Sequence, residues 1–218
     1  MELKNKTVAV LGDSITQGTG ASKQENRFVN VFSEITQSKT INYGIGGTSI
    51  APQHTPLWGQ LHDKNFMIRV PEMEENVDAV VVFGGTIYFG HGDAPFGETE
   101  DVEPVTFCGS CDVLFKELVN KYPSKPIVVM TPLHRIGEED TINEIGLKRK
   151  ILAEYVDALK KKAQKYSLPV LDLFSQSGMQ PNIEQQNKLY FADGLHPNDL
   201  GHERIAKMLK KFFEVNLI

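Results

Sequence analysis

The sequence has little cysteine, no long apolar run and no excess of positive charge. Its 218 residues include 2 cysteines, with 23 Lys and Arg against 28 Asp and Glu, and the formal net charge is −5. This balance does not favour binding to nucleic acid or to an anionic membrane, and the lysine run at 160–162 is interpreted as a solvated helix face. No apolar run approaches the length of a bilayer span, so we expect no integral membrane segment. Residues 1–6 are polar and lack a signal pattern, so we expect a cytoplasmic protein, with a trimmed exported precursor as the alternative.

Residue patterns that build metal or redox centres are also scarce. Cys108 and Cys111 form a C-x-x-C pair, but no second pair completes a zinc site and no thioredoxin-like pattern surrounds it. We interpret them as incidental thiols at the start of a helix. No H-E-x-x-H motif or His–Asp cluster indicates a catalytic metal, and His202 is expected on the surface of the last helix. We therefore expect no cofactor.

What the sequence does contain is an alternation of short apolar segments with longer amphipathic ones. The predicted strands are 7–11, 40–43, 79–83, 127–131 and 169–173, and the predicted helices are 27–37, 112–121, 142–166 and 199–215. This alternation indicates a parallel sheet that is covered on both faces. We predict a single α/β domain over 1–218, a three-layer α/β/α sandwich with a five-stranded parallel sheet of the flavodoxin-like kind.

Two segments interrupt the alternation, at 51–71 and at 89–109. The second is rich in glycine and acidic residues. Long loops inside compact domains are usually functional, so we predict that 89–109 forms part of a substrate rim. The alternative is a solvated surface insertion.

Residues that could carry out catalysis lie near both ends of the chain. Ser14 follows the first predicted strand, where open α/β sheets bind ligands, although a serine there could simply cap the next segment. A serine becomes nucleophilic when a base takes its proton and a carboxylate holds that base. Asp193 and His196 could supply these roles if the fold brings the two ends together. The alternative is a structural loop before a helix that Asn198 or Asp199 caps.

These motifs resemble those of the SGNH, or GDSL, hydrolases. The resemblance rests on the G-D-S-I motif at 12–15, a glycine-rich block at 42–48 and D-G-L-H at 193–196, in the family's order and over nearly the whole chain. It implies an SGNH-hydrolase fold and a serine esterase with Ser14 as nucleophile, His196 as base and Asp193 as the acid that orients it. The implied partner is a small-molecule ester: a short acyl ester, an acetylated sugar or a lysophospholipid. The polar, glycine-rich rim favours a small or sugar-linked acyl group.

The glycine-rich block implies an oxyanion hole by the same resemblance. Its donors would be the backbone N–H groups of Ser14 and Gly47, with Gly46 as the neighbour if the register shifts by one. Without the flanking motifs, the block would be interpreted as a tight turn. It does not match a dinucleotide-binding G-x-G-x-x-G fingerprint, because the third glycine would fall at Ser49.

The block after the third predicted strand departs from the family pattern. Family members carry G-x-N-D there, and the Asn side chain is the third oxyanion donor. Here Ile87 stands in place of the Asn and Tyr88 in place of the Asp. Isoleucine cannot donate a hydrogen bond, and the neighbouring Thr86 would need a different backbone path to replace it. We predict a full triad with an impaired oxyanion hole, and substrate contacts from Gly46, Thr86, Ile87 and Tyr88. The alternative is a carbohydrate- or acyl-binding module that has lost activity.

Overall fold

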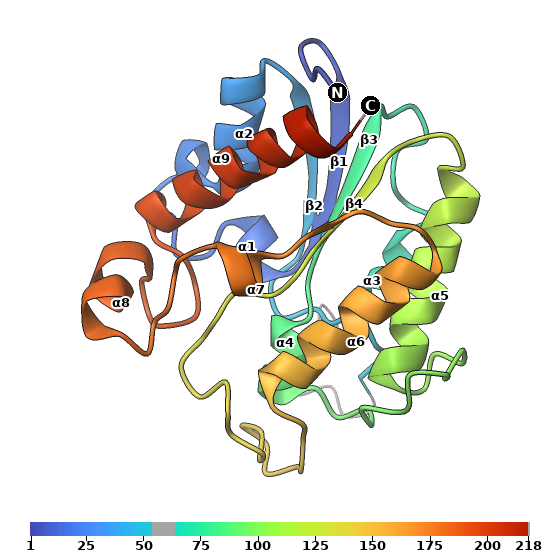
Figure 1. Ribbon diagram of the computed structural model, residues 1–218, viewed down its shortest axis with the longest axis vertical. Coiled ribbons are helices and arrows are strands. Elements are labelled where there is room, and N and C mark those ends of the chain that lie inside the picture. Colours follow the sequence, from blue (N-terminus) through green and yellow to red (C-terminus); the bar gives the residue numbers. More distant parts are fainter. Residues whose placement is uncertain (54–63, 218) are drawn as a thin grey trace.

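The fold is built on one sheet of five parallel strands. The computed structural model describes residues 1–53 and 64–217, and for Tyr88 it describes the backbone only. The strands are β1 (Thr7–Gly12), β2 (Lys39–Gly44), β3 (Ala79–Phe83), β4 (Ile127–Met130) and β5 (Val170–Leu171). They run in the order β2-β1-β3-β4-β5, with every pairing parallel (Figure 1). This is the flavodoxin-like strand order, so the predicted fold class is confirmed.

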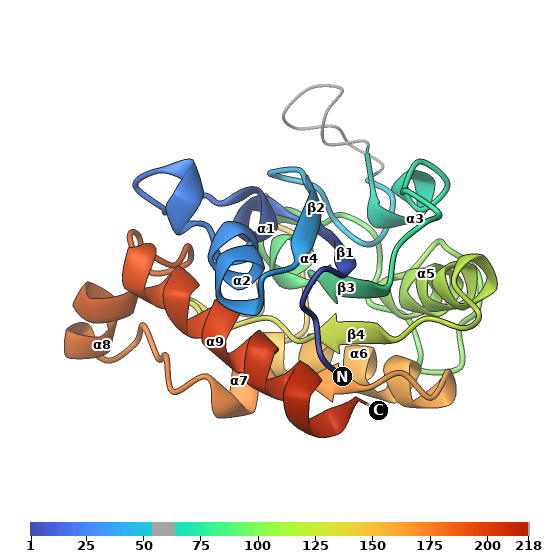
Figure 2. The same cartoon turned by 90° about the horizontal axis from the view of Figure 1, so that it is seen from above.

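Helices cover both faces of the sheet (Figure 2). One face packs against α2 (Phe28–Thr36) and α9 (Asp199–Asn216), and the other against α3 (Phe66–Arg69), α5 (Phe107–Lys121) and α6 (Leu152–Lys165). Side chains alternate between the faces of a strand. Accordingly, Val8 and Val10 of β1 join the core under α2 and α9, whereas Ala9 and Leu11 join the opposite core. Both faces are therefore apolar, as the short apolar strands predicted.

Short helices lie at the ends of strands and in the connections. They are α1 (Ser14–Gln17), the 3₁₀ helix η1 (Gln24–Asn26), α4 (Thr86–His91), α7 (Leu173–Gln176) and α8 (Glu184–Tyr190). Helices α1, α4 and α7 follow β1, β3 and β5, so they gather at the carboxyl edge of the sheet (Figure 1). The described chain termini lie at the opposite edge. The carboxyl edge is where side chains from different strands can meet.

The predicted helix 142–166 is wrong over its first ten residues. Helix α6 begins at Leu152, and the preceding segment is irregular. The Asn143 side-chain oxygen accepts from the N–H groups of Ile145 and Leu147, so it competes with helical hydrogen bonding. Helix α5, in contrast, begins five residues before its predicted start, because the Thr106 hydroxyl caps it by accepting from the Gly109 N–H.

The interpretation of His202 as a surface residue is wrong, and the interpretation of the lysine run as a solvated face is wrong at Lys162. His202 has no exposed surface and packs in α9 against Phe28 of α2, with ring centroids 6.2 Å apart. Within the lysine run, Lys162 is buried and forms an ion pair of 3.1 Å with Asp112 of α5. A buried charge is tolerated only when it is paired, and periodicity alone does not reveal the partner.

The two cysteines lie in the first turns of α5, as predicted. Both are buried and form no disulfide, and burial raises the pKa of the Cys108 thiol to about 11. Thiolate is the reactive form of cysteine, and a raised pKa keeps the thiol protonated at neutral pH. Both side chains are therefore expected to have low reactivity.

The segment 89–109 is only partly a loop, because it starts in α4 and ends in α5. Between them, the carbonyls of Pro95 and Phe96 accept from the first N–H groups of α5, and the Phe96 ring packs on Tyr155 of α6 at 4.9 Å. Its contribution to a substrate rim stays a prediction.

In the described part of the chain, no helix has both the length and the apolar character that a bilayer span requires.

Candidate active site

The fold brings Ser14, His196 and Asp193 into contact, although 182 positions separate the first two. The Ser14 hydroxyl lies 3.0 Å from His196 Nε2, and His196 Nδ1 lies 2.7 Å from an Asp193 carboxylate oxygen. Ser14 is the first residue of α1, separated from β1 by Asp13 alone, and the other two lie in the loop before α9. The imidazole thus bridges a hydroxyl and a carboxylate, as a charge-oriented general base requires.

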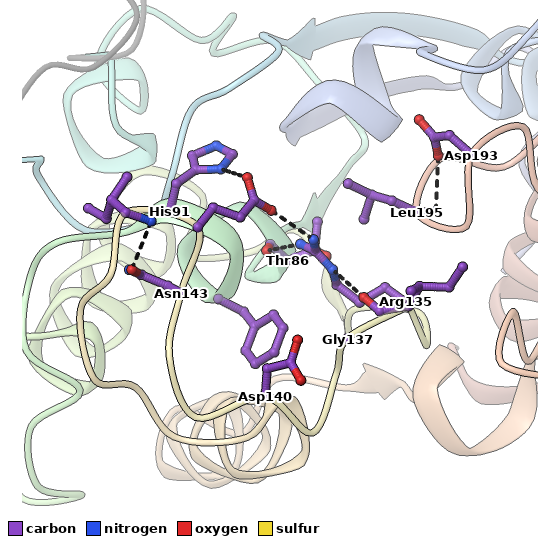
Figure 3. A network of polar contacts seen from close by, with 12 residues as sticks. Thr86, His91, Arg135, Gly137, Asp140, Asn143, Asp193 and Leu195 are labelled. Carbon is purple, nitrogen blue, oxygen red and sulfur yellow. Dashed lines mark hydrogen bonds and ion pairs between the residues drawn. The ribbon is translucent and has the colours of Figure 1, made fainter.

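The loop that carries Asp193 and His196 is held in shape by the carboxylate itself. Asp193 Oδ1 accepts from the backbone N–H groups of Leu195 and His196, at 3.0 and 2.7 Å, and Figure 3 shows the Leu195 contact. Gly194, which lies between Asp193 and Leu195, adopts a φ of +80°, which glycine tolerates best. Partial burial opposes ionisation, but hydrogen bonds from the His196 side chain and from both backbone N–H groups hold the pKa of Asp193 below its ordinary value. The carboxylate therefore remains charged beside the imidazole.

The turn that carries Ser14 is fixed by its neighbour Asp13. This side chain is 1% exposed, and its Oδ1 caps α1 by accepting from the Ile15 N–H at 3.0 Å. Burial raises the pKa of Asp13 to about 6, and the other carboxylate oxygen has no hydrogen-bond partner among the described residues. The Asp13 side chain therefore fixes the turn through a hydrogen bond to the backbone.

A buried arginine that the sequence analysis missed lies beneath this turn. Arg69 of α3 is 3% exposed and donates to the carbonyl oxygens of Gly12 and Tyr43, at 3.2 and 2.6 Å, and to the Thr48 hydroxyl at 2.9 Å. It thus joins the ends of β1 and β2 to the glycine-rich loop. Burial lowers the pKa of Arg69 to about 10, so it remains a cation at neutral pH. The sequence did contain one indication that Arg69 is buried, because it lies inside the apolar run 66–70.

The glycine-rich loop after β2 lies against α1. The Gly46 N–H donates to the side-chain oxygen of Gln17 at 2.7 Å, so this N–H already has a partner within the protein. Gly47 follows with a φ of +75°. This contact argues against Gly46 as an oxyanion donor. The role of Gly47 stays a prediction.

The block after β3 turns directly into α4. Gly85 makes this turn with a φ of +114°, and Thr86 and Ile87 form the first turn of the helix, 3% and 4% exposed. The Thr86 hydroxyl is buried and has no hydrogen-bond partner within the described chain. The side chain of Tyr88, for which a substrate contact is predicted, lies outside what the structure describes. No amide or charged side chain occupies the first two positions of α4.

A polar network fixes α4 to the irregular segment before α6 (Figure 3). Arg135 donates to the Thr86 carbonyl at 3.3 Å and to Glu144 at 3.1 Å, and Glu144 contacts His91 at 3.2 Å. The Asn143 amide donates to the Gly92 carbonyl at 2.9 Å. The start of α4 is thus held from outside the sheet.

Over the described residues, no group of three His, Cys, Asp or Glu side chains is placed to hold a metal ion.

Comparisons with known proteins identify the family and the fold of this chain. The model of the GDSL-like lipase/acylhydrolase family matches residues 10–204. A crystal structure of a Lactobacillus plantarum protein is similar at 26% identity and a TM-score of 0.84, covering 99% of this chain and 100% of that one. A possible lipase from Chitinophaga pinensis has 21% identity and a TM-score of 0.69, with 96% and 98% covered. A putative GDSL-like lipase from Bacteroides ovatus has 16% identity and a TM-score of 0.65, with 97% and 99% covered, and these last two likenesses speak for the fold alone. None of the curated proteins matches the chain.

Proposed function

This chain belongs to the GDSL-like lipase/acylhydrolase family, a family of hydrolases, and we propose that it is a serine esterase that cleaves carboxylic esters. The observation that carries the proposal is the continuous contact from Ser14 through His196 to Asp193, with distances of 3.0 and 2.7 Å. A hydroxyl, an imidazole and a carboxylate in this order are the parts that nucleophilic acyl transfer needs. We propose that residues 1–218 form one SGNH-hydrolase-like domain.

In the proposed reaction, His196 Nε2 takes the Ser14 proton while Oγ attacks the ester carbonyl carbon. The tetrahedral intermediate collapses, the alcohol leaves with the proton from His196, and an acyl-enzyme remains. Water, activated by the same imidazole, then releases the acid and restores the serine. Asp193 keeps a proton on Nδ1 and stabilises the imidazolium that forms in each half of the cycle.

The proposed oxyanion hole consists of backbone N–H groups. Ser14 lies at the start of α1, where N–H groups favour negative charge, and Gly47 supplies the second donor by family resemblance. Ile87 supplies no side-chain donor, and losing one such donor typically costs about 100- to 1000-fold in turnover. We therefore propose a slow esterase that acts on short acyl esters or acetylated sugars, with lysophospholipids as the third class.

Labelling tests this proposal. The purified protein should hydrolyse p-nitrophenyl acetate, and an organophosphonate should stop the reaction while mass spectrometry places one adduct on Ser14. Ser14→Ala should abolish both hydrolysis and labelling. An adduct at another residue, or folded protein without an adduct, would contradict the nucleophile assignment.

Ile87 also favours a second candidate, a carbohydrate- or acyl-binding module without activity. A binder needs neither of the two contacts that join Ser14 to Asp193 through His196, and the chain retains both. Folded protein that binds an acetylated sugar in calorimetry, yet neither hydrolyses esters nor reacts with phosphonate, would favour the binding module.

A further inference from the structure

Gln17 makes a contact beside the nucleophile that the proposed mechanism does not use. It lies three residues after Ser14, at the end of α1, and its side chain is exposed. Its side-chain oxygen reaches the glycine-rich loop and accepts from the Gly46 N–H at 2.7 Å. The amide of an exposed glutamine can form its hydrogen bonds with water. Its hydrogen bond to the Gly46 N–H therefore gives the Gln17 side chain a defined position against the loop.

The contact belongs to a wider connection between α1 and the loop. The Asn42 amide donates to the Thr16 carbonyl and its oxygen accepts from the Gly44 N–H, both at 2.8 Å. At Gly44, a Cβ would lie 2.2 Å from the Gln17 backbone nitrogen, so the two backbones touch. Asn42 therefore fixes where the loop begins, and Gln17 fixes its course two residues further along.

The space around Gly46 ties the amide to the nucleophile. A Cβ built at Gly46 would lie 2.5 Å from the Gln17 side-chain oxygen and 3.7 Å from Ser14 Cβ. Gly46 therefore lies between these two side chains. Gly46 does not adopt a positive φ. Glycine fits here because a side chain would collide with Gln17, and not because the backbone conformation requires it.

We infer that Gln17 is a positioning residue that acts through Gly46 to hold the Gly46–Gly47 backbone in register with Ser14. This inference rests on the proposed function, in which that backbone supplies an oxyanion donor. With Ile87 in place of a side-chain donor, the backbone donors carry a larger share of the transition-state charge. Small rotations of the loop then affect turnover directly, because such donors act only when they are aimed correctly.

Single variants test the direction of the effect. Gln17→Ala and Gln17→Met should lower kcat for p-nitrophenyl acetate about tenfold, while KM stays within about twofold, because the contact acts on the transition state. The pH profile should not move, since neither His196 nor Asp193 is touched. Gln185→Ala, at an exposed glutamine on α8, is the matched control and should match wild type.

A double-mutant cycle tests the route through Gly46. The methyl group of Gly46→Ala would displace the Gln17 amide, so this variant should lose as much kcat as Gln17→Ala. Once Gln17→Ala has removed the obstacle, Gly46→Ala should cost nothing further, because coupled sites are not additive. Losses that multiply in the double variant, or a Gln17→Ala variant as fast as wild type, would overturn the inference. If wild type is active and Ser14→Ala is not, such a result leaves the proposed function standing. Wild type that neither hydrolyses esters nor reacts with phosphonate would overturn both.

Discussion

At the scale of single residues, two aspartates near Ser14 have opposite electrostatic surroundings. Asp193 accepts three hydrogen bonds and its pKa lies below the ordinary value, whereas burial raises the pKa of Asp13 to about 6. Asp193 is therefore suited to stabilise an imidazolium. Asp13 is suited to cap a helix.

Asp193→Asn should lower kcat by about 10³- to 10⁴-fold, the range typical of losing a triad carboxylate. The amide oxygen can still accept from the Leu195 and His196 N–H groups. Its NH₂ group would then face His196 Nδ1, where the reaction needs an acceptor. Steady-state kinetics on p-nitrophenyl acetate measure the loss.

The matched control is Asp199→Asn at the start of α9. Asp199 accepts from Ser22 and Asn26 and does not touch His196 through any hydrogen bond in the described structure. This variant should retain activity within a few-fold of wild type. An Asp193→Asn enzyme that is equally active would remove Asp193 from the triad.

At the scale of elements, α4 determines which side-chain donors the chain can offer to the proposed oxyanion hole. Its first turn, at Thr86 and Ile87, stands at the carboxyl end of β3 but presents no amide. The Arg135 contact to the Thr86 carbonyl holds this turn in place. A donor introduced at residue 87 would therefore start from a fixed backbone.

Ile87→Asn should raise kcat about tenfold, less than the full value of one oxyanion donor, because nothing in the chain is arranged to orient the new amide. The side chain is 4% exposed, so the polar group should also lower the free energy of unfolding by about 1–3 kcal/mol. Kinetics and urea denaturation measure the two effects separately.

Ile87→Val is the control for that experiment, because it changes volume without adding a donor. Its kcat should match wild type. If Ile87→Asn is folded and labelled at Ser14 but no faster, residue 87 does not face the oxyanion. The Thr86 hydroxyl would then be the next position to vary.

The same elements show what the sequence could reveal. Strand β3 has its predicted bounds because the apolar run 79–83 is short, rich in β-branched valine and followed by two glycines, which favours a buried strand. Helix α4 was not predicted, since six residues are too few to display a helical period. Ser14, Asp193 and His196 were identified because their motifs are local. Arg69 was missed because its partners, Gly12, Tyr43 and Thr48, are distant in sequence and contribute mostly backbone atoms.

At the scale of the whole molecule, His202 links the last helix to the first crossover connection. Its Nδ1 accepts from the Phe28 N–H at 3.3 Å, so the proton lies on Nε2, 3.2 Å from the Thr19 carbonyl that accepts it. Burial lowers the pKa of His202 from 6.5 to about 4. The folded protein therefore binds this proton less readily than the unfolded chain.

The stability that depends on neutral His202 should be fully present above pH 6.5 and lost as the pH falls toward 4, by up to about 3 kcal/mol. Asp13 contributes in the opposite direction, because its raised pKa makes the folded state lose stability as pH rises from 3.8 to about 6. The difference between wild type and His202→Gln isolates the histidine.

Urea denaturation of both proteins between pH 4 and 8 measures this difference. The advantage of wild type over His202→Gln should shrink as the solution becomes more acidic. Two stability curves that stay parallel across this range would show that His202 does not set the acid response.

The distance along the chain between Ser14 and His196 has a consequence for biosynthesis. All five strands precede His196, so during translation the sheet can pair while the imidazole is still inside the ribosome or not yet made. The nucleophile is then present without its base, and α9 has not yet docked on α2. A nascent chain of this protein can therefore acquire most of its architecture and still be chemically inert. Under the proposed function, the nucleophile gains its base only when the segment before α9 has joined the turn after β1.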